Sequence, residues 1–170
     1  MKICDLFPDN SIQDVLRMFI PNVLHIEREY ANIEQHLMNN LDNFITAFPW
    51  NLKLENLLTM NARDITMTVH QFSTTDLNRF LKLWIRGANP RLEHLKLRLR
   101  NSSKLEMGRT WKGIKYDVAP NAVRREFQYA LDRRAITYGG FDIRRMDGTV
   151  AIVHTNEHTF FEMFVIAKNI

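Results

Sequence analysis

The sequence predicts an α/β fold in which a short βα array is followed by a C-terminal antiparallel β meander. Residues 64–69 and 94–100 alternate apolar and polar side chains, which is typical of strands with one buried face. Residues 73–86, which lie between them, place apolar side chains at helical spacing. Residues 141–153 hold an Asp-Gly pair between two alternating runs, which is typical of a β-hairpin.

The composition is that of a single globular domain, which we expect to span residues 1–170. The apolar fraction is 45%, and eleven Phe and three Trp supply a packed core. No apolar run approaches the roughly 18–20 residues of a bilayer-spanning helix, so we expect no membrane role. The single cysteine, Cys4, excludes an intrachain disulfide. A reducing compartment follows, so we expect an intracellular protein of the cytoplasm or nucleus.

The N-terminal elements are predicted from shorter patterns. Apolar spacing predicts a helix over residues 11–19, and residues 22–27 read as a short strand. Residues 28–49 are ambiguous, because the pattern favours a helix while several asparagines weaken that assignment. A further helix is predicted over residues 49–61, with Pro49 near its first turn.

The segment from Ser73 to Pro90 contains the clearest helix signals. Ser73 and Asp76 have capping-box spacing, with Asp in place of the usual Glu. Gly87 fits the left-handed position that follows a helix, and Pro90 blocks its continuation. The helix should bury a broad apolar stripe, which consists of Leu77, Phe80, Leu81, Trp84 and Ile85.

Strand, helix and strand in this order predict a βαβ unit with two parallel, neighbouring strands and a right-handed crossover. Ile65 and Leu95 occupy equivalent positions 30 residues apart. The sequence "LEHLKL" has the Leu-x-x-Leu-x-Leu spacing of a leucine-rich-repeat strand, although Arg100 stands where that motif has Asn. We therefore predict a short leucine-rich-repeat-like βα array in the first 100 residues.

The pattern changes after residue 100. Residues 101–113 are polar and contain glycine, so a loop is predicted, and residues 121–135 are compatible with a short helix. Gly148 supplies the positive φ of the hairpin turn within residues 141–153, and residues 159–166 form a third strand. These strands constitute the predicted meander.

The charge is uneven along the chain. Residues 1–62 contain four Lys/Arg and eight Asp/Glu, whereas residues 86–115 contain nine Lys/Arg and two Glu. Such a basic band attracts acidic partners, nucleic acid or a membrane surface, or is simply a solvated face. No RNA-binding aromatic motif, zinc-finger spacing or helix-turn-helix is present, so an acidic protein segment is the favoured partner and nucleic acid the less favoured one.

The predicted partner-binding residues follow from the βαβ unit. If its two strands are parallel neighbours, their polar faces form one patch that grips an acidic protein segment, with Arg pairing to carboxylates. The alternative is that the patch is only the soluble side of a half-buried sheet. The patch consists of Thr66, Thr68, His70, His94, Lys96, Arg98 and Arg100.

Residues 50–166 resemble the type 2 F-box-associated domain of a large nematode family of F-box proteins. The resemblance is carried by "WNLKLENLLTMN", "LNRFLKLWIRGANPRLE" and "GGFDIRRMDGTVAIV…FEMFVI". It implies a domain that selects the protein substrate, while an N-terminal F-box docks on the adaptor of a cullin–RING ubiquitin ligase. The opening "LFPDNSIQDVLRMFIPNVLHIE" is too short for an F-box, so we expect the F-box to be absent and an adaptor to bind only if an F-box-like element exists. The alternative is a stand-alone basic-surface binder of nucleic acid or acidic proteins with no ligase role.

The sequence contains no catalytic motif, so we expect no enzyme, no cofactor and no metal. His154 and His158 are four residues apart but flank a predicted turn, which does not give helical metal-ligand geometry. Gly139-Gly140 precedes a strand and lacks the helix N-terminus of a phosphate loop. The competing hypothesis is a small enzyme whose site assembles from residues distant in sequence.

Overall fold

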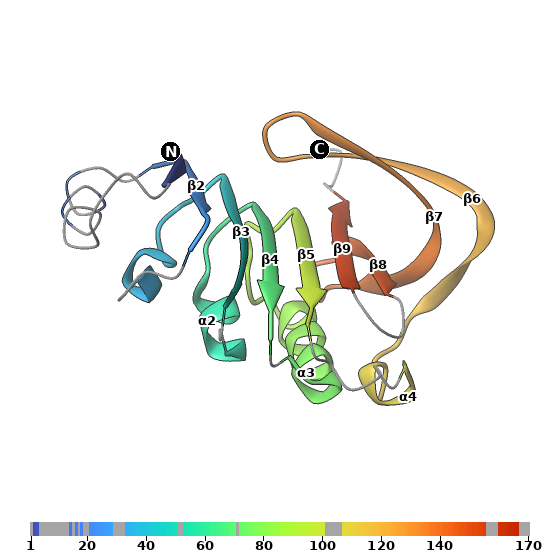
Figure 1. Cartoon of the computed structure of the whole chain (residues 1–170). Coiled ribbons are helices and arrows are strands. Elements are labelled where there is room, and N and C mark those ends of the chain that lie inside the picture. The colour runs from blue at the N-terminus through green and yellow to red at the C-terminus, as the bar shows by residue number, and fades with distance from the viewer. Residues whose placement is uncertain are drawn as a thin grey trace.

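The computed structural model of this chain is a mixed α/β fold built on one nine-stranded sheet (Figure 1). The described residues are 2–3, 14, 16, 18, 21–28, 33–50, 53–70, 72–100, 107–155 and 160–166. The strand order is β1-β2-β3-β4-β5-β9-β8-β7-β6. The first five strands follow the chain order, and the last four follow it in reverse.

The parallel half of the sheet comes first along the chain. Its strands are β1 (Lys2–Ile3), β2 (Val23–Ile26), β3 (Asn43–Trp50), β4 (Asp64–Val69) and β5 (His94–Leu99). Its connections contain the 3₁₀ helix η1 (Ile33–His36) and the α-helices α2 (Leu54–Thr59) and α3 (Thr74–Ile85). Helices α2 and α3 lie on the same side of the sheet (Figure 1).

The predicted βαβ unit is confirmed. β4 pairs in parallel with β5, and Ile65 lies opposite Leu95 in the register. Because alternate side chains of a strand share a face, Ile65 and Leu95 point towards the helices with the other apolar residues of their strands. The buried residues of α3 that cover this face are Leu77, Phe80, Leu81 and Trp84.

The predicted ends of α3 are also confirmed. Ser73 Oγ accepts a hydrogen bond from the Asp76 backbone N–H at 3.1 Å, and Asp76 Oδ2 accepts one from the Ser73 N–H at 2.9 Å. This reciprocal pair satisfies two of the N–H groups that a helix start leaves open. Gly87, with φ of +114°, follows the helix in the conformation that glycine tolerates best.

The antiparallel half completes the sheet. Its strands are β6 (Asp117–Tyr129), β7 (Arg133–Arg144), β8 (Val150–Thr155) and β9 (Phe160–Ile166), and a short helix α4 (Met107–Thr110) precedes them. β9 pairs antiparallel with β5, so it joins the two halves. The predicted hairpin between β7 and β8 is present, with Gly148 at a φ of +90° in its turn.

The helix predicted over residues 121–135 is wrong, because this segment is the end of β6 and the start of β7. The two strands meet in a tight turn in which Leu131 and Asp132 have φ of +61° and +56°. Positive φ at two successive residues is the signature of a hairpin turn that matches strand twist. The ring of Phe127 stacks on that of Phe164 of β9 at 4.6 Å, a contact that helix propensity does not reveal.

Other boundaries differ from the predictions. The helix predicted over residues 49–61 begins only at Leu54, because Pro49 and its neighbour end strand β3. Residues 28–49 contain η1 and most of β3 in place of one helix. The loop predicted over residues 101–113 contains α4, and its first six residues lie outside the described ones. The helix predicted over residues 11–19 falls mostly outside them as well.

In the part of the chain that the structure describes, no helix combines the length and apolar character needed to cross a membrane.

Candidate functional site

The sheet face opposite the helices is partly covered by the β6–β7 hairpin, which curves over it (Figure 1). Tyr129 packs against His94 of β5 with ring centroids 4.4 Å apart. Arg133 Nη1 lies 2.7 Å from Asp64 Oδ2 at the start of β4. The tip of the hairpin therefore covers the N-terminal ends of β4 and β5.

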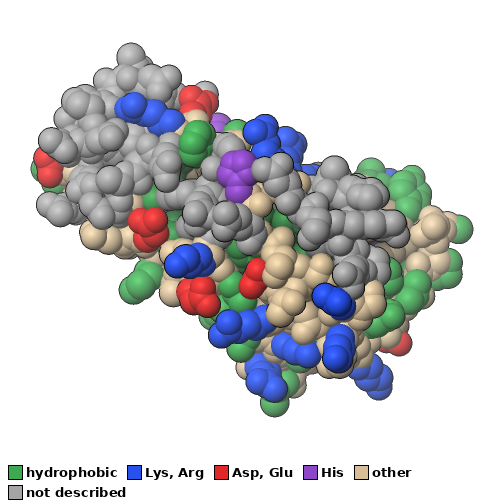
Figure 2. Space-filling model, turned by 60° about the horizontal axis from the view of Figure 1, so that its bottom comes forward, with side chains coloured by type: hydrophobic (Ala, Val, Ile, Leu, Met, Phe, Trp, Pro, Cys, Tyr) green, Lys and Arg blue, Asp and Glu red, His purple; other side chains and the backbone are tan. Residues whose placement is uncertain are grey.

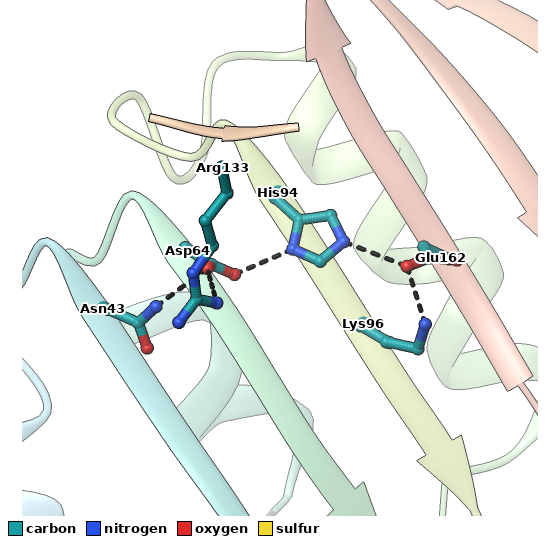
Figure 3. Close-up of polar contacts among 6 residues, drawn as sticks. All are labelled: Asn43, Asp64, His94, Lys96, Arg133 and Glu162. Carbon is teal, nitrogen blue, oxygen red and sulfur yellow. Dashed lines mark hydrogen bonds and ion pairs between the residues drawn. The ribbon is translucent and has the colours of Figure 1, made fainter. Parts of the chain in front are cut away.

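Asp64 is the centre of a buried polar network beneath the hairpin tip (Figure 3). Its side chain is fully buried, and its two oxygens receive three contacts. Asn43 Nδ2 donates to Oδ2 at 2.9 Å, Arg133 Nη1 donates to the same oxygen, and His94 Nδ1 lies 2.7 Å from Oδ1. A buried carboxylate is tolerated when charged and polar donors satisfy it in this way.

His94 links this network to the neighbouring strand. Its Nε2 lies 3.1 Å from Glu162 Oε1 of β9, so both ring nitrogens face carboxylates. Burial lowers the pKa of His94, but the hydrogen bonds and charges of Asp64 and Glu162 outweigh burial and raise the pKa above 6.5. The imidazolium form is favoured because it donates to both carboxylates at once.

Glu162 extends the network towards solvent. Lys96 Nζ donates to Glu162 Oε1 at 2.9 Å. Burial raises the pKa of Glu162, but the hydrogen bonds and charges of His94 and Lys96 outweigh it, so the pKa lies below 4.5. Glu162 is thus an ionised carboxylate with two cationic neighbours.

The stability of the folded protein is expected to depend on pH through His94. The unfolded chain has an ordinary histidine pKa of about 6.5, and the folded pKa is higher. The stabilisation is therefore complete below the unfolded pKa and is lost as pH rises through the folded one. Unfolding by urea between pH 6 and 8.5, for the wild type and His94→Gln, measures it.

The difference in the free energy of unfolding between these two proteins should shrink as pH rises. His154 is present in both proteins, so its own titration largely cancels in the comparison. Burial lowers the pKa of His154, which is the opposite shift. A difference that stays constant across this pH range would show that His94 is not held as an imidazolium.

The burial of this network indicates that it stabilises the fold. Only 4% of the His94 side chain is exposed, and the ring packs against Tyr129 and Phe164. A general acid or base must reach a substrate proton directly or through one water, and this ring is enclosed. Among the described residues, no group of three His, Cys, Asp or Glu side chains has an arrangement that could hold a metal ion.

A groove lies on the same face, beyond the hairpin tip, at the C-terminal ends of β4 and β5. Its volume is about 580 Å³. Arg98 and Arg100 are exposed and form no ion pair with any described residue, whereas Lys96 is held by Glu162. The lining residues are Ala47, Thr68, Lys96, Arg98, Leu99, Arg100, Phe160 and Glu162.

The parallel half that provides much of this groove is similar to a known protein family. Residues 32–97 match the family described as F-box associated. The matched range extends from the region of η1 into β5. The resemblance inferred from the sequence for residues 50–166 is therefore confirmed over residues 50–97. Comparisons with curated proteins and with solved structures give no match.

Residues 32–97 and the residues that follow them bring together four of the seven predicted partner-binding residues. Thr66 lies opposite Lys96 and Thr68 opposite Arg98 in the register, as two parallel neighbours require. The four that line the groove are Thr68, Lys96, Arg98 and Arg100.

The other three predicted residues do not line the groove. His94 is on the expected face but is buried beneath the hairpin. The prediction that it contributes to a surface patch is therefore wrong. Thr66 and His70 are half-buried and lie outside the groove lining.

Sequence reasoning missed the carboxylates of this face. Asp64 precedes an alternating apolar run, and Glu162 is the only charged side chain within the aromatic strand Phe160–Ile166. An acidic residue in such a strand signals a buried partner of opposite charge. Arg133 gave no such signal, because the sequence predicted a helix around it.

Proposed function

We propose that this protein is a non-catalytic interaction module that binds an acidic segment of a protein partner in the groove beside β5. It resembles the substrate-recognition domain of F-box proteins in cullin–RING ubiquitin ligases. The observation that carries the proposal is the position of Arg98 and Arg100, two exposed cations beside the aromatic ring of Phe160 in one groove. Arginine suits this role because its planar group pairs with carboxylates in a bidentate manner.

The electrostatics of the groove favour an acidic guest. Its lining has three cations and one carboxylate, Glu162. Lys96 and His94 already engage that carboxylate, so it opposes an incoming acid only weakly. Phe160 and Ala47 add apolar surface for side chains that flank the acidic residues.

Finer aspects of the proposal rest on the sequence patterns together with the family resemblance. We infer that the parallel strands and their helical crossovers form a leucine-rich-repeat-like array whose open face receives the partner. A cullin-ligase adaptor would bind only through an F-box-like element. The partner would be a protein substrate, and the site of action would be the cytoplasm or nucleus.

Charge reversal at the groove tests the binding mode. We expect Arg98→Glu and Arg100→Glu each to weaken binding of a fluorescein-labelled octaglutamate peptide about ten-fold or more, since each replaces an attraction with a repulsion. Fluorescence anisotropy at fixed ionic strength measures the affinity. Arg134→Glu is the matched control, because this arginine is exposed and belongs to β7. Equal weakening in all three variants would reduce the effect to net charge and contradict the proposal.

A ligase role is tested separately. Affinity capture from native tissue with the wild type and Arg98→Glu, scored for cullin-ligase subunits, reports on adaptor docking. We expect partner recovery to fall in the variant while any ligase subunits remain. Capture of specific partners without ligase subunits would favour a stand-alone binder.

The second candidate function is binding of nucleic acid through the basic band of residues 86–115. The nine Lys and Arg residues of this band give the candidate its physical basis. Figure 2 shows Lys and Arg side chains close together at the lower end of one face. Phosphate-backbone binding weakens steeply with salt, so titration of a labelled single-stranded oligonucleotide at increasing salt tests it. Absence of binding, or binding insensitive to salt, would exclude this function.

A further inference from the structure

A second concave site lies near the C-terminal end of α3, remote from the groove in its residues and independent of the proposed function. Its volume is about 230 Å³. Three separate segments build it: the end of α3, the connection from α4 to β6, and the end of β7. The lining residues are Lys82, Ile85, Arg86, Gly113, Ile114, Lys115 and Arg144.

Hydrogen bonds fix these three segments to one another. Asn78 Nδ2 of α3 donates to the carbonyls of Thr110 and Lys112 at 2.7 and 3.0 Å, which anchors the connection that follows α4. The turn after β7 is held by the Met146 N–H, which donates to the Ile85 carbonyl at 2.9 Å. The backbone segments that carry the cations therefore need little rearrangement on binding, which favours affinity.

Gly113, beside Lys82, has a left-handed backbone conformation that favours glycine. Gly113 has a φ of +69°, and a Cβ atom at this position would lie 3.4 Å from Lys82 Nζ. A residue with a Cβ atom would be strained by this backbone conformation, whereas its contact with the ammonium group would be an ordinary van der Waals one. The backbone at Gly113 therefore forms a wall of the site directly beside Lys82.

The side chains that line this site give it a strong excess of positive charge. Four cations line it, no carboxylate does, and none of the four forms an ion pair with a described carboxylate. Lys82 and Arg86 complement the dipole of α3, whose C-terminal end they occupy. That explanation does not cover Lys115 and Arg144, which come from other segments and face the same concavity.

We propose that this pocket binds a phosphate group, either as the free ion or on a phosphorylated side chain of a protein. Convergent Lys and Arg donors form charge-assisted hydrogen bonds with phosphate oxygens, and arginine does so with two donors at once. A dianionic group would relieve the repulsion among four cations held together by the fold. Ile85 and Ile114 supply apolar surface beside the charges.

Calorimetric titration with three probes tests this site: inorganic phosphate, an acetyl-Gly-Ala-phosphoserine-Ala-Gly-amide peptide, and the same peptide without phosphate. Ionic strength is held constant with sodium chloride. We expect saturable binding of the two phosphate-bearing probes and a loss of affinity of about ten-fold or more in Arg144→Gln and Lys115→Gln. Both side chains are exposed, so the variants should fold, which thermal melting checks.

The matched control is Lys112→Gln, which removes one exposed positive charge from the same connection but outside the lining. Its affinity for phosphate should equal that of the wild type. Tighter binding of the phosphopeptide than of the free ion would identify a phosphorylated protein as the source of the group. Absence of saturable binding, or an equal loss in all three variants, would overturn the proposal.

Discussion

Replacement of Asp64 by alanine is expected to lower the free energy of unfolding by about 3–5 kcal/mol, because it removes one partner from a buried network of charges. Asp64 is fully buried and accepts contacts from Asn43, His94 and Arg133. Without it, a buried amide and a buried imidazole lose their main partner. The guanidinium of Arg133 also loses the contact that holds the hairpin tip to the sheet.

Chemical denaturation of wild type and Asp64→Ala measures this loss. Asp42→Ala is the control, since the Asp42 side chain is 25% exposed and its two contacts with arginines are 3.7 Å long. Such partly exposed pairs contribute about 0–1 kcal/mol. Hydrogen exchange should also become faster over residues 127–135 in Asp64→Ala alone. Equal destabilisation by the two substitutions would contradict the role assigned to the network.

Replacement of Trp84 by alanine is expected to destabilise the protein by about 3–5 kcal/mol through loss of buried contacts and formation of a cavity. Trp84 is fully buried on the apolar stripe of α3. The guanidinium carbon of Arg145 lies 5.4 Å from the centroid of the Trp84 ring, and Arg145 Nη2 donates to the Gly87 carbonyl at 2.5 Å. The truncation would therefore disturb both the core and the contact between α3 and the β7–β8 turn.

Trp84→Phe separates the contribution of side-chain volume from that of the indole N–H. It retains much of the side-chain volume and removes an indole N–H that has no hydrogen-bond partner in the described part of the chain. We expect it to recover a large part of the stability lost in Trp84→Ala, as measured by urea denaturation. A small effect of Trp84→Ala on the free energy of unfolding would mean that the stripe of α3 is not the centre of the core.

The elements that the sequence predicted well are those whose cause is local. The strand Asp64–Val69 and the helix Thr74–Ile85 follow from side-chain periodicity, from the capping pair of Ser73 and Asp76, and from Gly87. Each of these signals acts within a few residues of the chain. The parallel pairing of β4 and β5 then follows from the crossover rules for a strand, helix and strand.

The segment from residue 121 to 135 shows where such reasoning fails. Its charged residues and alanines satisfy a helical pattern, but it pairs as two strands and packs Phe127 on Phe164. The stabilising contact connects residues that are far apart in the sequence. Burial of aromatic surface against a distant strand outweighs helix propensity, which amounts to less than about 1 kcal/mol for an ordinary residue.

The candidate site also has one part that local sequence patterns predicted and another that depends on long-range contacts. Alternation along β4 and β5 by itself assigned Thr68, Lys96 and Arg98 to one polar face, and the structure has them in one groove. The tertiary structure alone decided which cations on that face have partners among the described residues. Glu162 contacts both Lys96 and His94, although it lies 66 and 68 residues away from them in the sequence. Arg133 lies 69 residues from Asp64 and holds the hairpin tip over the sheet through its contact with that carboxylate. Periodicity determines the face on which a side chain lies, whereas its partner depends on contacts that only the folded chain creates.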